Sequence, residues 1–194
     1  MQPKVISITQ PTELGTVYTP REINRIADFA HRHGLLLHMN GARLCNAAAY
    51  LDVRLRNLTG DVGVDILSFG GTKNGLMFGE AVVFFNKELS RNFVFIRKQG
   101  MQLASKMRFI SAQFEAFLSN DLWLRNARHA NSMARLLYED VKGISGVEVP
   151  YRVESNAVFA VIPKWSISKF TGRLFLLCDE RKDLVRWMCS FSTS

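Results

Sequence analysis

Residues 64–75 of the chain read Val64-Asp65-Ile66-Leu67-Ser68-Phe69-Gly70-Gly71-Thr72-Lys73-Asn74-Gly75. The run 64–67 is short and apolar, which predicts a buried strand of a parallel sheet. A second apolar run, Ala81-Val82-Val83-Phe84-Phe85, follows the stretch. Lys73 is therefore expected on a turn between two strands, flanked by glycines that allow positive φ angles and the close approach of a ligand.

Two interpretations of Lys73 remain open. Partial desolvation on such a turn would lower the pKa of the lysine, so that its neutral amine could attack an aldehyde and form a Schiff base. The alternative is a solvated lysine at the tip of a hairpin, without a chemical role.

A strand–helix–strand unit precedes the lysine stretch. The β-branched segment Val5–Thr9 predicts a strand. Thr19-Pro20-Arg21-Glu22 predicts a helix start, because it offers an N-cap, a proline at the first helical position and the glutamate of a capping box. Gly34 ends that helix, and Leu35–Met39 predicts the next strand. Such a βαβ unit crosses over right-handedly within a parallel sheet.

The second strand ends in Asn40-Gly41-Ala42-Arg43. In open parallel sheets, ligands bind just beyond the carboxyl ends of the strands, so Asn40 and Arg43 are expected at the same edge as Lys73. The fork geometry of an arginine suits a carboxylate or a phosphate. The alternative for Arg43 is a side chain at a helix N-terminus that bonds to a neighbouring loop.

The remainder of the chain is expected to be helical and then stranded. Helices are predicted near 42–51, 88–98 and 105–118, and Asp121 is expected to cap a longer helix that reaches Val141. Strands are predicted over 147–149, 157–161, 175–178 and 184–188, which makes a small α+β unit. Arg186 lies inside the last apolar strand, and a buried arginine needs an anionic partner from the protein or from a substrate.

Composition limits the class of protein. With 194 residues, 47% of them apolar, the chain can bury a core. No apolar run approaches the ~20 residues of a membrane span, and no signal peptide is recognised. Cys45, Cys178 and Cys189 are odd in number and far apart. No metal site and no disulfide framework is expected from them, and the reducing cytoplasm fits best.

The net charge of +8 raises the question of an anionic partner. Ten Lys/Arg stand against five Asp/Glu between Lys87 and Lys142. Such a surplus either steers anionic small molecules or binds nucleic acid. The charges are spaced along predicted helices with acids among them, and no aromatic stacking platform accompanies them. A nucleic-acid partner is therefore not expected.

Five segments, in this order, resemble the threonine aldolase and β-eliminating lyase family of pyridoxal-phosphate enzymes. They are Ile8–Tyr18, His38–Arg43, Ser68–Gly75, Lys106–Phe109 and Val185–Met188. The resemblance implies an α/β fold with an incomplete, mostly parallel sheet of the PLP-dependent transferase-like (type I) fold. It also implies two domains: a truncated cofactor-binding domain over residues 1–119 and a small C-terminal α+β domain over residues 120–194.

The resemblance further implies a function for individual residues. Lys73 would be the catalytic lysine that forms the internal aldimine with pyridoxal 5′-phosphate, and Asn40 and Arg43 would contact this cofactor. Arg43 would line the site near both cofactor and substrate, and Arg186 would hold the substrate carboxylate. The family cleaves β-hydroxy-α-amino acids such as threonine to glycine and an aldehyde, with the cofactor as electron sink. The expected partners are a small amino-acid substrate and further copies of the chain in a homo-oligomer.

The sequence departs from the family pattern in two respects. Asn40 stands where the family has an aspartate that keeps the pyridine nitrogen protonated, so slow Cα–Cβ cleavage is expected. The family's N-terminal half, with its phosphate-binding loop, and its closing C-terminal helix have no counterpart in these residues. An open sheet edge and face, and self-association, are expected as a result. The alternative function is a catalytically inactive remnant that binds an intact homologue.

Overall fold

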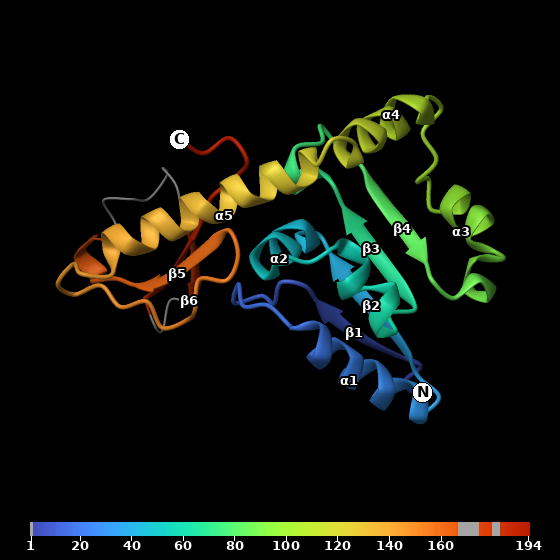
Figure 1. Cartoon of the computed structure of the whole chain (residues 1–194), viewed down its shortest axis with the longest axis horizontal. Helices are drawn as coiled ribbons and strands as arrows, with labels where there is room; N and C mark the ends of the chain where they lie inside the picture. Colours follow the sequence, from blue (N-terminus) through green and yellow to red (C-terminus); the bar gives the residue numbers. More distant parts are fainter. Residues whose placement is uncertain (1, 167–174, 180–182) are drawn as a thin grey trace.

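The computed structural model describes residues 2–166, 175–179 and 183–194, and it contains two sheets connected by a long helix (Figure 1). The first sheet has the order β1-β2-β3-β4, with β1, β2 and β3 parallel and β4 antiparallel to β3. The second sheet has the order β5-β7-β6 and is antiparallel. The strands are β1 (Val5–Thr9), β2 (Leu36–Gly41), β3 (Ile66–Gly70), β4 (Glu80–Phe84), β5 (Ala157–Val161), β6 (Phe175–Asp179) and β7 (Leu184–Met188). The mostly parallel α/β fold expected from the sequence is confirmed.

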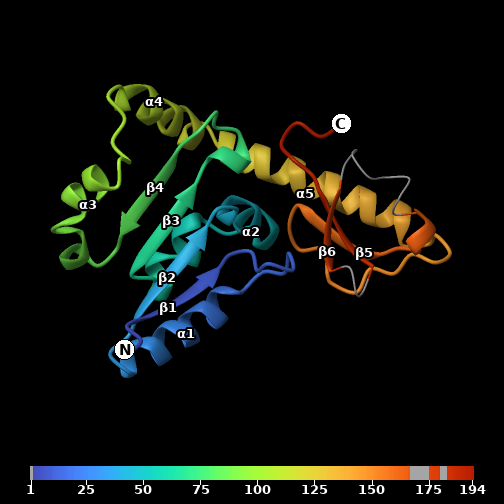
Figure 2. The ribbon, with the colours of Figure 1, turned by 180° about the vertical axis from the view of Figure 1, so that it is seen from behind.

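Helices pack against one face of the first sheet and form the main core there (Figure 2). Leu37 and Met39 of β2 and Leu67 and Phe69 of β3 point into this core. Burying each such side chain contributes about 1.5–3 kcal/mol. The helices are α1 (Pro20–Arg32), α2 (Leu44–Leu51), α3 (Phe93–Gln99), α4 (Met107–Leu118) and α5 (Leu122–Val141). Within the described ranges, none of the helices is long and apolar enough to cross a membrane.

The opposite face of the first sheet is open except at Phe84 of β4, which lies on this face and packs against Phe93 of α3. Val5 and Val82 on this face are 46% and 40% exposed. Between them Ser7 pairs with His38 across β1 and β2, and the His38 ring also lies within hydrogen-bond distance of Ser68 on β3, so that three polar side chains form a row on this face. The expected open face is therefore present in the folded chain, and the self-association expected from it stays a prediction.

The start of α1 confirms the predicted capping box. The Thr19 hydroxyl accepts a hydrogen bond from the Glu22 N–H at 3.3 Å, and the Glu22 carboxylate accepts one from the Thr19 N–H at 2.7 Å. Gly34 follows the helix with a φ of +67°, which places it in the left-handed region that favours glycine.

The strand predicted over 147–149 is wrong. Only Glu148 pairs with another strand, through two backbone hydrogen bonds with Val161 of 3.0 and 2.8 Å. Gly146 turns the chain just before this bridge with a φ of +85°, and Pro150 just after it has no N–H to continue the ladder.

Two helix starts also differ from the expectation. Asp121 precedes α5 in a left-handed conformation with a φ of +55°, and its side chain makes no capping hydrogen bond. A side-chain cap requires an extended N-cap residue, which explains the failure. The helix predicted near 88–98 is divided into a 3-10 helix, η4 (Lys87–Ser90), and α3. The chain turns between them, and the Phe93 ring packs edge-on against Phe84 with centroids 4.9 Å apart.

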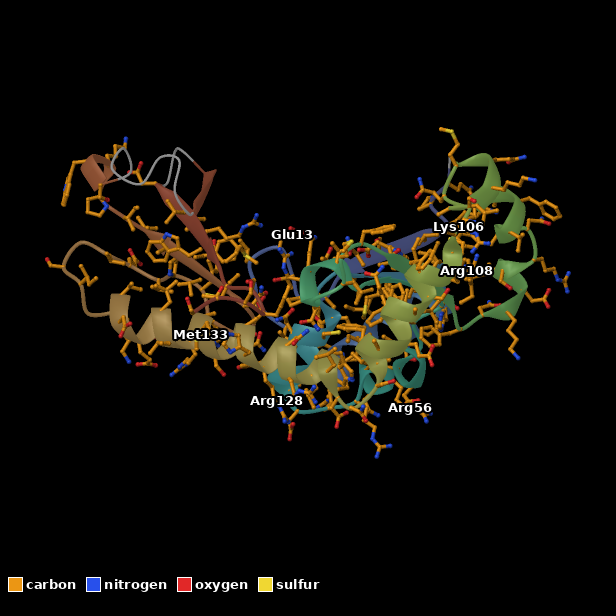
Figure 3. All side chains as sticks on the ribbon, turned by 90° about the horizontal axis from the view of Figure 1, so that it is seen from above. Glu13, Arg56, Lys106, Arg108, Arg128 and Met133 are labelled. Atoms are coloured by element: carbon orange, nitrogen blue, oxygen red, sulfur yellow. The ribbon has the colours of Figure 1, made fainter. Side chains whose placement is uncertain are left out.

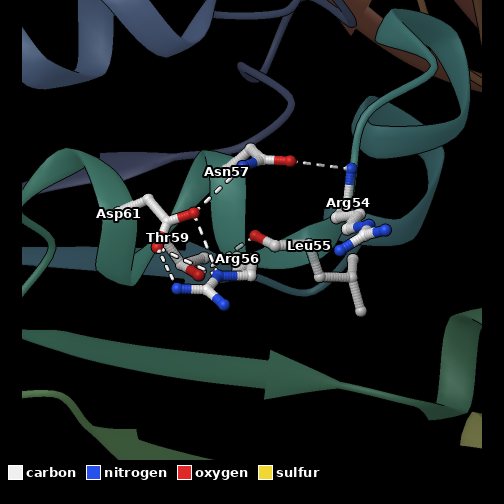
Figure 4. A network of polar contacts seen from close by, with 6 residues as sticks. All are labelled: Arg54, Leu55, Arg56, Asn57, Thr59 and Asp61. Atoms are coloured by element: carbon white, nitrogen blue, oxygen red, sulfur yellow. Dashed lines mark hydrogen bonds and ion pairs between the residues drawn. The ribbon is translucent and has the colours of Figure 1, made fainter.

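A compact polar network shapes the loop that enters β3 (Figure 4). It spans two 3-10 helices, η1 (Leu55–Leu58) and η2 (Gly60–Val62). The Arg56 guanidinium donates to both Asp61 oxygens through Nε at 3.0 Å and to Oδ1 through Nη2 at 2.8 Å. Hydrogen bonding to Arg56 lowers the pKa of Asp61. The network lies on the surface and sets the approach of the chain to the strand that leads to Lys73.

Candidate active site

The predicted site residues Asn40, Arg43 and Lys73 follow neighbouring strands. The Asn40 side-chain oxygen accepts a hydrogen bond from the Ala42 N–H at 3.1 Å, which shapes the turn from β2 towards Arg43. A Cβ added at Gly70 would lie 2.8 Å from the Ala42 Cα, so the ends of β2 and β3 are in backbone contact. Three further residues span at most about 11 Å, which keeps Lys73 near this contact. The three residues therefore share one edge of the sheet.

Lys73 lies in a 3-10 turn, η3 (Thr72–Asn74), between β3 and β4. Its side chain is exposed to solvent, as in the interpretation of a solvated lysine on a turn, and the partial desolvation of the other interpretation is not present. The reason is local: Thr72 and Gly75 beside it are exposed as well, and only Asn74 of the turn is buried. The expected turn between two sheet strands is confirmed.

Arg43 and Arg186 are brought together in a small pocket between the two sheets. Its volume is about 40 Å³, and its lining includes Gln10, Glu13, Arg43, Asn156 and Arg186, but not Lys73. This volume suits a carboxylate group rather than a whole cofactor. Figure 3 shows Glu13, which is labelled, between the two sheets.

Both guanidinium groups have unused hydrogen-bonding capacity inside this pocket. The Nε atoms of Arg43 and Arg186 are buried, and neither has a hydrogen-bond partner within the part of the chain that the structure describes. Burial lowers the pKa of Arg43, the positive charge of Arg186 lowers it further, and Glu13 partly offsets both effects. Buried donors without partners are costly, and an anion between the two arginines would satisfy them. The geometry therefore favours the ligand interpretation of Arg43 over a bond to a neighbouring loop.

Asn156 adds an acceptor to the pocket. Its Nδ2 donates to the Cys189 carbonyl at 2.6 Å, which directs its Oδ1 away from that bond. This Oδ1 is buried and has no partner among residues 2–166, 175–179 and 183–194. Asn156 and Glu13 were not among the site residues predicted from the sequence. The available signal for Asn156 was a polar residue directly before the apolar strand β5.

The pocket wall is held in place from both sheets. Gln10 is fully buried, and its side-chain amide bonds to both backbone groups of Tyr18, at 2.8 and 3.1 Å. The Val17 N–H donates to the Glu154 carboxylate at 2.8 Å, and the Ser155 hydroxyl donates to the Gly15 carbonyl at 3.0 Å. The loop that carries Glu13 is therefore fastened at both ends.

His38 is a further polar residue on the open sheet face. Its Nδ1 lies 2.7 Å from the Ser7 hydroxyl and its Nε2 lies 3.0 Å from the Ser68 hydroxyl. Burial lowers the pKa of His38, which favours a neutral imidazole between the two hydroxyls. Because side chains alternate along a strand, His38 and Asn40 face the same side of the sheet.

Parallel strands that lead to a lysine turn, with a two-arginine pocket beside them, define an α/β protein with a candidate anion site at the carboxyl edge of its sheet. The sequence profile of the beta-eliminating lyase family matches residues 1–164, and the chain belongs to this family. The resemblance found in the sequence is thereby confirmed. It also implies the family cofactor, pyridoxal 5′-phosphate.

Curated relatives and a solved structure agree with this assignment. The chain is 44% identical to the low specificity L-threonine aldolase of Pseudomonas aeruginosa and 49% identical to that of a Pseudomonas species. Each alignment covers 99% of this chain and 56% of the relative. The structure is similar to that of Leishmania major threonine aldolase, with a TM-score of 0.89 and 28% identity over 99% of this chain and 57% of that one. The chain thus spans little more than half the length of these relatives.

Proposed function

We propose that the chain is part of a pyridoxal-phosphate-dependent aldehyde-lyase of the threonine aldolase type. Its substrates would be β-hydroxy-α-amino acids such as threonine, cleaved to glycine and an aldehyde. The observation that supports the proposal is the pair of buried Nε atoms of Arg43 and Arg186, which have no hydrogen-bond partner among the described residues, near the sheet edge that also bears Lys73. The identity to low specificity L-threonine aldolases supports it.

Each site residue has a distinct role in this proposal. Arg186 and Arg43 hold the substrate carboxylate, and Lys73 supplies the amine that fixes the cofactor. The cofactor, when bound, provides an electron sink for the charge left on Cα after cleavage. Asn40 is positioned to contact the ring nitrogen of the cofactor, and its amide can donate or accept a hydrogen bond but carries no charge.

The organisation of the protein is part of the same proposal. Residues 1–119 form the cofactor-binding domain, and residues 120–194 form the small domain that brings Arg186 to the site. A homo-oligomer would cover the open sheet face and the exposed Lys73. The cytoplasm is the proposed compartment, because Cys45 and Cys189 are free thiols.

The test is a visible absorption spectrum of the purified chain with pyridoxal phosphate. A band that is lost in Lys73→Ala, and that borohydride reduction traps on Lys73, supports the proposal. Lys87→Ala is the matched control, because Lys87 is an exposed lysine in η4, away from the sheet edge. Formation of glycine and acetaldehyde from threonine then tests turnover. If no band forms, or if the band survives Lys73→Ala, the chain is the inactive alternative.

A further inference from the structure

The turn that carries Lys73 is tied to α5 by two amide hydrogen bonds that run in opposite directions. The Asn74 side chain donates from Nδ2 to the Trp123 carbonyl at 2.9 Å. The Asn126 side chain donates from Nδ2 to the Asn74 carbonyl at 2.8 Å. Asn74 is only 2% exposed, so both of its bonds are made away from solvent. The residue next to the exposed Lys73 is therefore fixed to a long helix.

The glycine after Asn74 makes this arrangement possible. Gly75 has a φ of +119°, a conformation that other residues rarely adopt. A Cβ at this position would lie 2.5 Å from the Asn126 Nδ2 atom. A side chain here would displace the amide that binds Asn74. Gly75 therefore provides both the turn conformation and the space for Asn126.

The far side of the turn is held by α4. The Met77 N–H donates to the Gln113 side-chain oxygen at 2.9 Å. A Cβ added at Gly79 would lie 3.1 Å from Ile110 and 3.2 Å from Phe114, so the backbone packs closely on this helix. The segment between β3 and β4 is thus held by α5 at Asn74 and by α4 after Leu76.

We propose that Asn74 and Asn126 are positioning residues for Lys73, fixing the backbone of its turn so that the amine meets the cofactor without a conformational search. This inference rests on the proposed function. A reacting side chain works best when a supporting shell locks its geometry, and for an exposed lysine this support comes through the backbone of its turn. Asn126 contacts Asn74 and acts through the turn.

The same helix offers a matched control. Asn131 of α5 forms an equivalent pair with Asn46 of α2. Asn46 Nδ2 donates to Asn131 Oδ1 at 3.0 Å, and Asn131 Nδ2 donates to the Asn46 carbonyl at 2.9 Å. Asn131→Ala therefore removes amide bonds between α5 and a neighbouring segment, as Asn126→Ala does, but leaves the Lys73 turn intact. A purely structural role predicts the same consequences for both variants.

The experiment compares Asn126→Ala, Asn126→Asp and Asn131→Ala in the full chain. Hydrogen–deuterium exchange of residues 72–77 is measured first without cofactor, and the affinity for pyridoxal phosphate is then measured from the Lys73-dependent band. Both Asn126 variants are expected to speed exchange in 72–77 and to weaken the cofactor roughly fivefold to tenfold, as the loss of one hydrogen bond implies. Asn131→Ala is expected to lower the melting temperature and to change neither quantity.

The outcomes are separable. The inference is overturned if exchange in 72–77 or cofactor affinity is the same in the Asn126 variants as in Asn131→Ala. If Asn126→Ala does not fold, Asn126→Asp carries the comparison, because it keeps the side-chain shape, replaces the donor with an oxygen and adds one negative charge. If the unmodified chain shows no Lys73-dependent band, the proposed function fails. The exchange comparison alone then decides whether Asn126 fixes the turn, and equal exchange overturns it.

Discussion

Replacing Asn40 with aspartate is expected to raise the turnover of the proposed lyase. Asn40 ends β2, and its side-chain oxygen accepts a hydrogen bond from the Ala42 N–H at 3.1 Å. A carboxylate can accept the same bond, so the turn towards Arg43 is retained. The change adds one negative charge where the cofactor ring nitrogen is expected, and this charge favours the protonated ring that accepts electrons.

The size of the effect follows from the exposure of Asn40. Opposite charges about 4 Å apart attract by about 1 kcal/mol in water and about 4 kcal/mol near a protein surface. At about 1.4 kcal/mol for each tenfold change, these energies correspond to roughly fivefold and roughly a thousandfold in turnover. Because Asn40 is exposed, the chain alone is expected near the lower value. Burial of the site by a second copy would move the gain towards the upper value.

The assay is acetaldehyde release from threonine at saturating pyridoxal phosphate. Asn92→Asp is the control, because it makes the same change of charge at the start of α3, where Asn92 forms no side-chain capping bond. A variant Asn40→Asp that binds the cofactor normally but is no faster than Asn92→Asp would refute the argument that the missing charge limits the reaction.

Three further predictions concern single side chains. Arg186→Leu should raise the KM for threonine roughly tenfold to a hundredfold, as expected for lost charge-assisted hydrogen bonds; an equal rise in Arg152→Leu, whose side chain is 87% exposed, would contradict the role of the pocket. Because burial lowers the pKa of His38 below its ordinary value of 6.5, the unfolded chain binds this proton first as the pH falls. Its contribution to stability is thus present above pH 6.5 and is lost below it. The difference in unfolding free energy between pH 7.5 and pH 5.0, measured with urea, should therefore be smaller in His38→Asn than in the native chain. Thr19→Ala should cost about 1 kcal/mol of unfolding free energy through the lost N-cap, and an unchanged urea midpoint would show that the capping box does not stabilise α1.

Much of the fold can be predicted from the sequence because its signals are local. The capping box of Thr19-Pro20-Arg21-Glu22, the stop at Gly34 and the apolar strand 5–9 each lie within a few residues, and the strand predicted over 64–67 exists but starts two residues later, at Ile66. The rule that parallel strands end at one edge then brings Asn40, Arg43 and Lys73 together. These expectations needed no knowledge of contacts between distant segments.

The remainder depends on contacts between distant segments. Asn126 is separated from Asn74 by 52 residues, and Ser155 from Gly15 by 140. The pattern of apolar residues within a short window of sequence gives no information about such pairs. The exposure of Lys73 could not be predicted for the same reason, because a glycine-flanked turn does not show whether a distant segment covers it. Asp121 is a favourable capping residue by type, but its left-handed backbone conformation prevents its side chain from capping α5.

The 20 residues of α5 also fix the rotation about the helix axis that relates the lysine turn to the sheet that carries Arg186. Trp123 and Asn126 contact the lysine turn, and further along the helix Ala134 packs with Val158 of the sheet that carries Arg186. Each helical residue adds 1.5 Å and about 100° of rotation. One residue inserted between Asn126 and Ala134 would swing Arg186 about 100° around the helix axis, away from Arg43. The length of α5, rather than the identity of its exposed residues, therefore keeps the two arginines together. An insertion or deletion in this helix would separate them.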